Sequence, residues 1–254
     1  MTKRDGGRPV QGNSSPPTTG VTSAAFGTAK RLLDILVAGS ALLLLLPVLV
    51  GAALAIKLES RGPIFYRCRR VGLAGREFSM LKLRKMRTGV TGAPLTAVDD
   101  DRFTRIGRFL AKSKIDEIPQ LWNALTGSMS LVGPRPEDPV FVALRAVEYE
   151  QILRVRPGIT GLSQLAFARE MAILDPNDRI GDYVRRLLPQ KMRLDQLYVT
   201  RRSLVMDLRI LWWTAVAVVF TREVAVDRST GDLNLRRRPQ PLRSEALQVE
   251  RAVP

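Results

Sequence analysis

Two adjacent acidic residues, Asp116 and Glu117, are the clearest candidates for chemistry, because they stand close to the basic residues Arg108 and Lys114. The chain has no histidine, which excludes a Ser-His triad and every histidine-based metal site. Its only cysteine, Cys68, cannot build a disulfide framework. Carboxylates and basic groups must therefore carry any chemistry of this chain.

The role of Asp116 has two interpretations. Ser113 lies three residues earlier, so the pair matches a capping box in which Asp116 only ties down a helix start. Alternatively, a helix N-terminus and nearby cations keep Asp116 ionised, and an ionised carboxylate can attack phosphorus as a nucleophile. In that case we expect Glu117 to help hold a Mg²⁺ ion that neutralises the charge of a diphosphate.

A second candidate is the tetrapeptide Gly133-Pro134-Arg135-Pro136. Its two prolines restrict the backbone around one arginine, and a planar guanidinium held in this way suits the recognition of a phosphate. A rigid connector with a solvated arginine would have the same sequence. The residues alone leave both interpretations open.

A dense basic run also attracts attention, and it contains Lys82, Arg84, Lys85 and Arg87. Strand alternation would place Lys82 and Arg84 on one face, whereas a solvated or lipid-facing patch would have the same composition. The whole chain has 40 Lys and Arg against 24 Asp and Glu, a net charge of +16. Such a charge implies nucleic acid, anionic lipid or a phosphorylated substrate as partner, and we recognise no nucleic-acid-binding motif.

The element that must anchor these residues is an apolar segment, Ile35 to Ile56, which carries no charge. As a helix it would be about 33 Å long, enough to cross a bilayer. Pro47 near its middle favours a break, and both flanks are basic. Because basic flanks prefer the cytosol, a re-entrant hairpin that enters and leaves by one face competes with a single span.

Composition divides the chain into four parts: a disordered tail (1–29), a membrane-embedded helix broken near Pro47 (30–58), a globular unit (59–221) and a disordered basic tail (222–254). Within the globular unit, periodicity predicts strands at 63–66 and 78–83 and helices at 105–112, 139–155 and 182–200. Another helix should hold Pro119 in its first turn, with Asp116 and Glu117 at or just before its start. The apolar stretch 210–220 fits either an interfacial or a core helix.

Several stretches, taken in order, resemble the monotopic phosphoglycosyl transferases, which are also called bacterial sugar transferases. They are KRLLDILVAG, GPIFYRCRRVGLAGREFSMLKLRKMR, DRFTRIGRFL, IDEIPQLWNALTGSMSLVGPRPEDP, RPGITGLSQ and DQLYVTRRSLVMDLRIL. The pair DEIPQLWN and GSMSLVGPRP is the most specific part. The resemblance runs from about Lys30 to Val219.

The resemblance implies a small α/β, mostly helical catalytic domain on a re-entrant membrane helix hairpin, with interfacial amphipathic helices, at the cytoplasmic face of the plasma (inner) membrane. It implies transfer of a sugar 1-phosphate from a UDP-sugar to polyprenyl phosphate, with Mg²⁺ as cofactor and UMP as product. The implied mechanism passes through a covalent aspartyl-phosphosugar on Asp116. The rival hypothesis is a membrane-tethered basic binding or scaffold protein without catalysis, and a homodimer is a further expectation for its assembly.

Residue roles follow from the resemblance alone. Asp116 is the nucleophile and Glu117 the Mg²⁺ or proton-handling partner, while the phosphate and substrate binders are Gly133, Pro134, Arg135, Lys82, Arg84, Arg108 and Gln164. Three positions depart from the family pattern: Leu46 replaces a serine before Pro47, Ala111 replaces an arginine, and Ser128 replaces an aspartate. Ala111 makes a contact near the nucleophile uncertain, and Leu46 removes a hydroxyl that would support the helix break.

Overall fold

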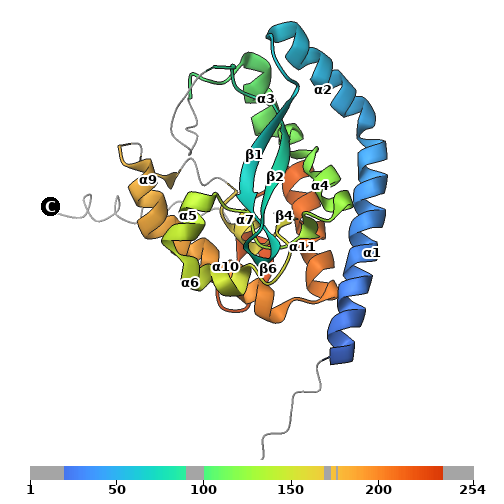
Figure 1. The fold of residues 1–254 in the computed structure, drawn as a ribbon, viewed down its shortest axis with the longest axis vertical. Coiled ribbons are helices and arrows are strands. Elements are labelled where there is room, and N and C mark those ends of the chain that lie inside the picture. The colour runs from blue at the N-terminus through green and yellow to red at the C-terminus, as the bar shows by residue number, and fades with distance from the viewer. Residues whose placement is uncertain (1–19, 90–99, 169–172, 176, 237–254) are drawn as a thin grey trace, which may run out of the picture.

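The computed structural model describes residues 20–89, 100–168, 173–175 and 177–236 of the 254-residue chain. A long bent helix pair runs along one side of a mostly helical body that contains three small two-stranded sheets in the described residues (Figure 1). The expected mostly helical α/β character is therefore confirmed. The predicted tails at 1–19 and 237–254 lie outside the described residues.

The bent pair consists of α1 (Gly20–Leu44) and α2 (Leu46–Glu59), which meet at an angle of 57°. Pro47 lies in the first turn of α2, where its missing N–H and its ring interrupt the ladder of backbone hydrogen bonds. The predicted helix break is present, although this chain has Leu46 at the position where the family pattern has serine. No single helix of the described part is long and apolar enough to cross a membrane, whereas the bent pair passes that test jointly.

The helix α1 begins at Gly20, so the prediction of a disordered tail is wrong for residues 20–29. Tertiary contacts stabilise this early start, because Lys30 forms an ion pair with Asp207 and Phe26 stacks against Arg202. Farther along, the outer side of the pair is apolar and exposed, with Leu44 78% and Leu58 88% accessible. The bent pair therefore presents an exposed hydrophobic face to its surroundings.

The long hairpin pairs β1 (Phe65–Val71) with β2 (Glu77–Leu83) in antiparallel register, with η1 (Leu73–Gly75) in the turn. Both strands were predicted, although β1 begins two residues later and continues to Val71. A second, parallel sheet pairs β3 (Ser130–Val132) with β4 (Gly158–Thr160). It is central to the site, because the GPRP segment follows β3 directly.

The remaining helices of the body are α3 (Arg105–Ser113), η2 (Ile115–Glu117), α4 (Gln120–Thr126), α5 (Pro139–Leu144), α6 (Ala146–Ile152), α7 (Leu162–Ala166), α9 (Arg179–Asp182), η3 (Tyr183–Leu187), α10 (Leu188–Arg201) and α11 (Leu204–Val219). The helix predicted at 139–155 is divided into α5 and α6 at Arg145. In the apolar stretch at 210–220, α11 buries Ile210 completely, which agrees with a core helix, while Trp212 remains 68% exposed and the interfacial role stays a prediction.

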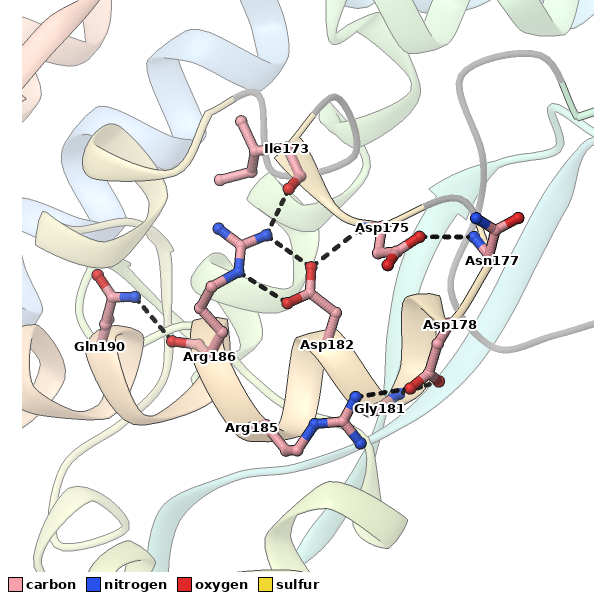
Figure 2. A network of polar contacts seen from close by, with 9 residues as sticks. All are labelled: Ile173, Asp175, Asn177, Asp178, Gly181, Asp182, Arg185, Arg186 and Gln190. Atoms are coloured by element: carbon pink, nitrogen blue, oxygen red, sulfur yellow. Dashed lines mark hydrogen bonds and ion pairs between the residues drawn. The ribbon is translucent and has the colours of Figure 1, made fainter.

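The predicted helix at 182–200 begins earlier, at Arg179, and runs through the π-helical turn η3 into α10. Figure 2 shows how its start is fixed. Asp178 accepts a hydrogen bond from the Gly181 N–H and pairs with Arg185, and Arg186 joins Asp182 to the carbonyl of Ile173. These exposed contacts fasten the preceding segment to the helix.

The C-terminal region corrects another prediction. Residues 222–236 are not a disordered tail, because β5 (Val224–Val226) and β6 (Leu233–Leu235) form an antiparallel hairpin. Val224 is buried in the main core together with Leu162, Leu194 and Ile210. The short Val-Ala-Val run has strong β propensity, but only this docking site makes a two-stranded hairpin stable.

Candidate active site

Asp116 and Glu117 lie in a tight connection between α3 and α4. Helix α3 ends at Lys114, which adopts the left-handed conformation (φ 62°) and reverses the chain into η2. Pro119 then starts α4, as predicted. The capping-box interpretation is wrong, because the Ser113 hydroxyl donates to the carbonyl oxygens of Phe109 and Leu110 within α3. Asp116 is therefore free of a capping role through Ser113.

Asp116 is almost completely buried, with 1% of its surface accessible. The Lys85 Nζ lies 3.4 Å from the Asp116 Oδ2, so the two form an ion pair. That buried Oδ2 accepts no well-directed hydrogen bond from the described residues. Burial raises the pKa of Asp116, and Lys85 opposes the rise only in part. Nearby cations thus favour the ionised form, as expected, but burial outweighs them and the net shift of the Asp116 pKa is upward.

Lys85 is a site residue that the sequence analysis named only as part of the basic run, without a role of its own. Strand β2 ends at Leu83, so alternation no longer applies two residues later. Its backbone is fixed by α3, since the Thr104 N–H donates to the Lys85 carbonyl and a Cβ at Gly107 would lie only 1.8 Å from that oxygen. The close approach that glycine permits here sets the position of Lys85. Lys85 thus places a cation beside Asp116 in a chain that has alanine at position 111, where the family pattern has arginine.

Glu117 is held by Lys82, whose Nζ donates to the Glu117 Oε1 at 2.9 Å. Burial tends to raise the pKa of Glu117, but Lys82, Arg135 and Lys114 together lower it well below its usual range. The two neighbouring acids therefore differ, with Glu117 firmly ionised and Asp116 less so. Such divergent pKa values in adjacent groups are typical of functional sites.

Asn123 explains why α4 and β2 meet in this register. Its side-chain oxygen accepts from the Leu81 N–H at 2.9 Å, and its amide nitrogen donates to the Ser79 carbonyl at 3.0 Å. These bonds mimic a strand partner at the edge of β2. Ser128 completes the arrangement, because it exchanges hydrogen bonds with the side chain and the carbonyl of Asn123. Serine at this departure from the family pattern thus supports the turn after α4.

The GPRP segment lies against the PGITG loop with backbone in close contact. The Gly133 N–H donates to Thr160 at 2.9 Å, and the Gly158 N–H donates to Pro134 at 2.7 Å. A Cβ at Gly133 would lie 2.6 Å from the Arg156 carbonyl oxygen, so only glycine fits. The positive charge of Arg135 lowers the pKa of Glu117. The fold thus brings Arg135 of the GSMSLVGPRP stretch close to Glu117 of the DEIPQLWN stretch.

Gln164 has a supporting position. Its amide nitrogen donates to the carbonyl oxygens of Gly158 and Gly133, at 3.2 and 3.4 Å, so it ties the two loops together. Its expected role as a substrate binder stays a prediction. Ser163 beside it donates to the buried Asp195 at 2.7 Å. Gln164 therefore positions the segment that carries Arg135.

Arg84 and Arg108 do not join this group. The Arg84 guanidinium donates to the carbonyls of Ser60 and Arg61 and to the Ser60 hydroxyl, so it closes the C-terminus of α2. Its predicted place on one face with Lys82 is wrong, because Arg84 lies beyond the end of β2. Arg108 is exposed on α3 and makes no side-chain contact with the described residues.

A buried polar network behind Arg135 also escaped prediction. Glu137 accepts from Lys191 at 2.8 Å and from the Tyr183 hydroxyl at 2.6 Å. Burial tends to raise the pKa of Glu137, but Lys191, Tyr183 and Arg135 together outweigh it and the pKa is lowered. Burial raises the pKa of Asp195 to about 7 against the opposing effect of Ser163 and Lys191. The only sequence signals for this network were two acidic residues, Glu137 directly after GPRP and Asp195 in DQLY.

The donor set fits a divalent cation of the Mg²⁺ type in a limited way. Asp116 and Glu117 offer hard carboxylate oxygens, and the Asp116 Oδ2 has no hydrogen-bond donor of its own among the described residues. No cluster of three or more acidic, histidine or cysteine ligands exists in that part of the chain. Mg²⁺ commonly binds one or two carboxylates and takes its other ligands from water and substrate phosphates.

Comparison with known proteins agrees with this geometry. The family model described as bacterial sugar transferase matches residues 25–221. A UDP-glucose:undecaprenyl-phosphate glucose-1-phosphate transferase of Caulobacter vibrioides is 40% identical over 202 residues, which cover 78% of this chain and 72% of the relative. The exopolysaccharide production protein PSS of Rhizobium leguminosarum bv. phaseoli is 39% identical, covering 74% of this chain and 94% of the relative.

Some relatives are much longer. A UDP-glucose:undecaprenyl-phosphate glucose-1-phosphate transferase of Xanthomonas campestris pv. campestris is 40% identical over 206 residues, and the matched part spans only 39% of its length. The family match, from residue 25 to 221, includes the site residues described above. The chain belongs to the bacterial sugar transferase family.

Proposed function

We propose that this protein transfers a sugar 1-phosphate from a UDP-sugar to undecaprenyl phosphate and releases UMP. The observation that carries the proposal is the buried Asp116, whose Oδ2 lacks a hydrogen-bond donor in the described residues and lies 3.4 Å from the Lys85 Nζ. The names of the Caulobacter and Xanthomonas relatives support the same reaction with UDP-glucose. An Aeromonas hydrophila relative is named for N-acetylgalactosamine, so the sugar of this chain is left open.

The proposed reaction has two steps. In the first, an Asp116 carboxylate oxygen bonds to the phosphorus that carries the sugar, the bond from that phosphorus to the bridging oxygen breaks, and UMP leaves with this oxygen. In the second, an oxygen of undecaprenyl phosphate attacks the same phosphorus, and the bond to Asp116 breaks and restores the carboxylate. Asp116 must be deprotonated to attack, and the nearby Lys85 favours that form.

Cationic side chains supply the electrostatic part of the mechanism. Lys82 and Lys85 come from β2 and the residues after it, and Arg135 comes from the loop after β3. Their charges would oppose the negative charge of the diphosphate and of the developing transition state. Gln164 and the Gly133–Gly158 contact would hold Arg135 in place while the substrate is exchanged.

Mg²⁺ is the proposed cofactor, held by Glu117 and Asp116 together with oxygen atoms of the substrate. When bound, it would neutralise diphosphate charge and make the phosphorus easier to attack. Lys82 keeps Glu117 ionised, which is the state that a hard cation needs. We expect chelation of divalent ions by EDTA to abolish transfer and added Mg²⁺ to restore it.

We further propose that α1 and α2 form a re-entrant hairpin and that the catalytic body lies on the cytoplasmic face of the plasma membrane. The 57° bend, the exposed apolar outer side and the basic residues at both ends of the pair support this topology. Trp122 and Trp212 are half-exposed or more, as expected for aromatic side chains at a membrane interface. This location would let a lipid phosphate and a soluble nucleotide-sugar meet at Asp116.

The test is a transfer assay on purified membranes that contain the full chain. Undecaprenyl phosphate and Mg²⁺ are supplied with a panel of UDP-sugars, labelled in the sugar, and both UMP and labelled lipid are measured. We expect one UDP-sugar to be turned over by the wild type and transfer by Asp116→Asn to fall by at least about a thousandfold, because the amide is a poor nucleophile.

The exposed Asp232 provides a matched control, and Asp232→Asn should retain full activity. An Asp116→Asn variant as active as the wild type would refute the proposed nucleophile. A wild type that turns over no UDP-sugar, yet still binds anionic lipid through its charge, would instead favour the membrane-tethered binding or scaffold protein.

A further inference from the structure

A second basic site lies at the opposite end of α4 from Asp116. It is a cavity of about 220 Å³, enclosed by the first described turns of α1, the residues that precede β4 and the connection from α10 to α11. Figure 1 shows this connection reaching the lower end of α1. Helix α4 separates the cavity from Asp116 by roughly 10 Å of helix or more. The cavity is therefore distinct from the proposed catalytic site.

The lining of the cavity is strongly cationic. Its charged residues are Lys30, Arg31, Asp34, Arg154, Arg156 and Arg202. The single acid, Asp34, is turned toward β3, where its Oδ1 accepts from the Ser130 hydroxyl at 3.0 Å and from the Leu131 N–H at 2.9 Å. Five cationic residues thus line the cavity, and the one acidic residue in the lining is already hydrogen-bonded to β3.

Two of these cations are committed to the fold. Lys30 donates to Asp207 at 2.7 Å, and Arg31 donates to the carbonyls of Ala124 and Leu125 at the end of α4. They form the floor of the site and contribute charge to it. Their bonds also fix the position of the cavity relative to α4.

The other three are arginines whose guanidinium groups retain unused donors. Arg156 Nε donates to the Gly127 carbonyl, and its terminal nitrogens have no hydrogen-bond partner among the described residues. Arg202 stacks on Phe26 at 5.6 Å, a contact that holds the guanidinium and uses none of its N–H groups. Arg154 meets only Glu150, at 3.8 Å in an exposed pair that contributes little.

We propose that this cavity binds a phosphate group, carried either by an anionic phospholipid headgroup or by a soluble phosphate ester. Planar guanidinium groups bind phosphate oxygens in pairs, and three arginines line this cavity. The volume is smaller than the roughly 300 Å³ at which drug-sized ligand pockets begin. A phosphate with a small substituent is therefore a better match in size than a whole nucleotide-sugar.

A lipid source is consistent with the surroundings. Leu32 and Leu36 follow the cavity on α1 and are exposed, so the basic site stands at the border between a polar and an apolar surface. Phospholipid phosphates lie at this border in a bilayer. A soluble ester would reach the same arginines from the aqueous side.

The test uses the full chain in a neutral detergent and follows its thermal unfolding. One arm adds inorganic phosphate at constant ionic strength, and the other adds phosphatidylglycerol against phosphatidylcholine at the same mole fraction. The variant Arg154→Gln/Arg156→Gln/Arg202→Gln is compared with Arg179→Gln/Arg193→Gln/Arg228→Gln, which removes the same charge outside the cavity, at side chains that form no hydrogen bond or ion pair with the described residues.

We expect at least one probe to raise the Tm of the wild type and of the control triple variant. In the cavity variant, half-saturation should require about tenfold more of that probe or should not occur. Loss of the phosphatidylglycerol effect alone identifies a lipid headgroup, and loss of the phosphate effect identifies a soluble ester. Equal responses of the two triple variants to both probes would refute the site.

Two measurements guard against an effect of misfolding. The Tm of each variant without probe is determined first, and Arg154→Gln is examined alone, because its side chain is 70% exposed and contributes little to the fold. A weakened response in this single variant, at an unchanged Tm, supports the site. An unchanged response in the single variant together with a normal response in the triple variant contradicts it.

Discussion

At the scale of single residues, the site depends on the contrast between Asp116 and Glu117. Both are surrounded by protein, but Glu117 has a direct hydrogen bond from Lys82, whereas Asp116 has a longer ion pair with Lys85. Burial therefore dominates the pKa of Asp116, and the nearby cations dominate the pKa of Glu117. Glu117, whose pKa is lowered, therefore remains ionised, whereas the raised pKa of Asp116 makes its ionisation depend more strongly on Lys85.

The Lys85→Met variant tests this balance. Removing the cation disfavours the ionised form of Asp116, so its pKa should rise further and the acid limb of the kcat/KM profile should move to higher pH by about one unit. Lys112→Met, at an exposed position on α3, is the matched control. A lower rate with an unmoved acid limb would mean that Lys85 acts on the substrate and not through Asp116.

Asp195 should make stability depend on pH. Because burial raises its pKa to about 7, the folded protein holds this proton in a range where the unfolded chain, with an ordinary pKa of 3.8, has lost it. Stability from this group is therefore complete below about pH 4 and declines as pH rises toward 7, at no more than about 1.4 kcal/mol per pH unit.

Asp195→Asn removes this proton and can keep the hydrogen bond from Ser163. We expect its free energy of unfolding, measured by denaturant in detergent, to decline less than that of the wild type between pH 5 and 7. The variant should gain stability relative to the wild type as pH increases. The same slope in both proteins would contradict the raised pKa.

At the scale of elements, the catalytic pair is placed by the docking of α4 on β2. Asn123 of α4 forms two hydrogen bonds with the backbone of β2, and Lys82 of β2 bonds to Glu117 in η2, the turn that leads into α4. Helix α3 contributes from its other end, since Gly107 lets it approach the Lys85 carbonyl. The acids therefore come from one connection, but their cations come from the hairpin.

The Asn123→Ala variant should disturb this docking. It leaves the Leu81 N–H and the Ser79 carbonyl of β2 without their side-chain partner, and the loss of each hydrogen bond costs about 0.5–1.5 kcal/mol. We expect a lower Tm and a kcat that falls more than KM rises, because Glu117 shifts relative to Lys82. Thr126→Ala, an exposed position on the same helix, is the control; equal activity in both variants would show that the docking is dispensable.

At the scale of the whole molecule, the bent pair and the body form one unit. Arg31, Lys30 and Asp34 of α1 bond to α4, α11 and β3 respectively. Arg84 closes the end of α2 from the strand hairpin. Both arms of the bent pair are thus fastened to the domain that carries Asp116, which fixes the distance of the site from the proposed membrane surface.

Topology provides the whole-molecule prediction. In a Cys68→Ala background, Ser14→Cys and Arg61→Cys report on the two ends of the bent pair. Both should resist a membrane-impermeant maleimide in spheroplasts and react in inverted vesicles, because a re-entrant pair returns to the side from which it enters. Labelling of only one of the two positions in spheroplasts would establish a single span and overturn the hairpin.

Local patterns in the sequence determined much of this protein. The helix break at Pro47, the two strands of the first hairpin and the helix start around Pro119 follow from proline geometry and periodicity, which act within a few residues. The basic charge and the DEIPQLWN and GSMSLVGPRP stretches located the candidate acids and Arg135. These features depend on neighbours in the chain, so the chain alone specifies them.

Only the tertiary structure decided which charged groups meet. Lys85 lies beside Asp116 and Arg84 is drawn to the end of α2, although both belong to one basic run, because the chain changes direction after Leu83. The same reason explains the helical residues 20–29 and the C-terminal hairpin, whose stability comes from distant contacts. Burial and charge pairing across more than twenty residues depend on packing, and a local pattern does not contain that information.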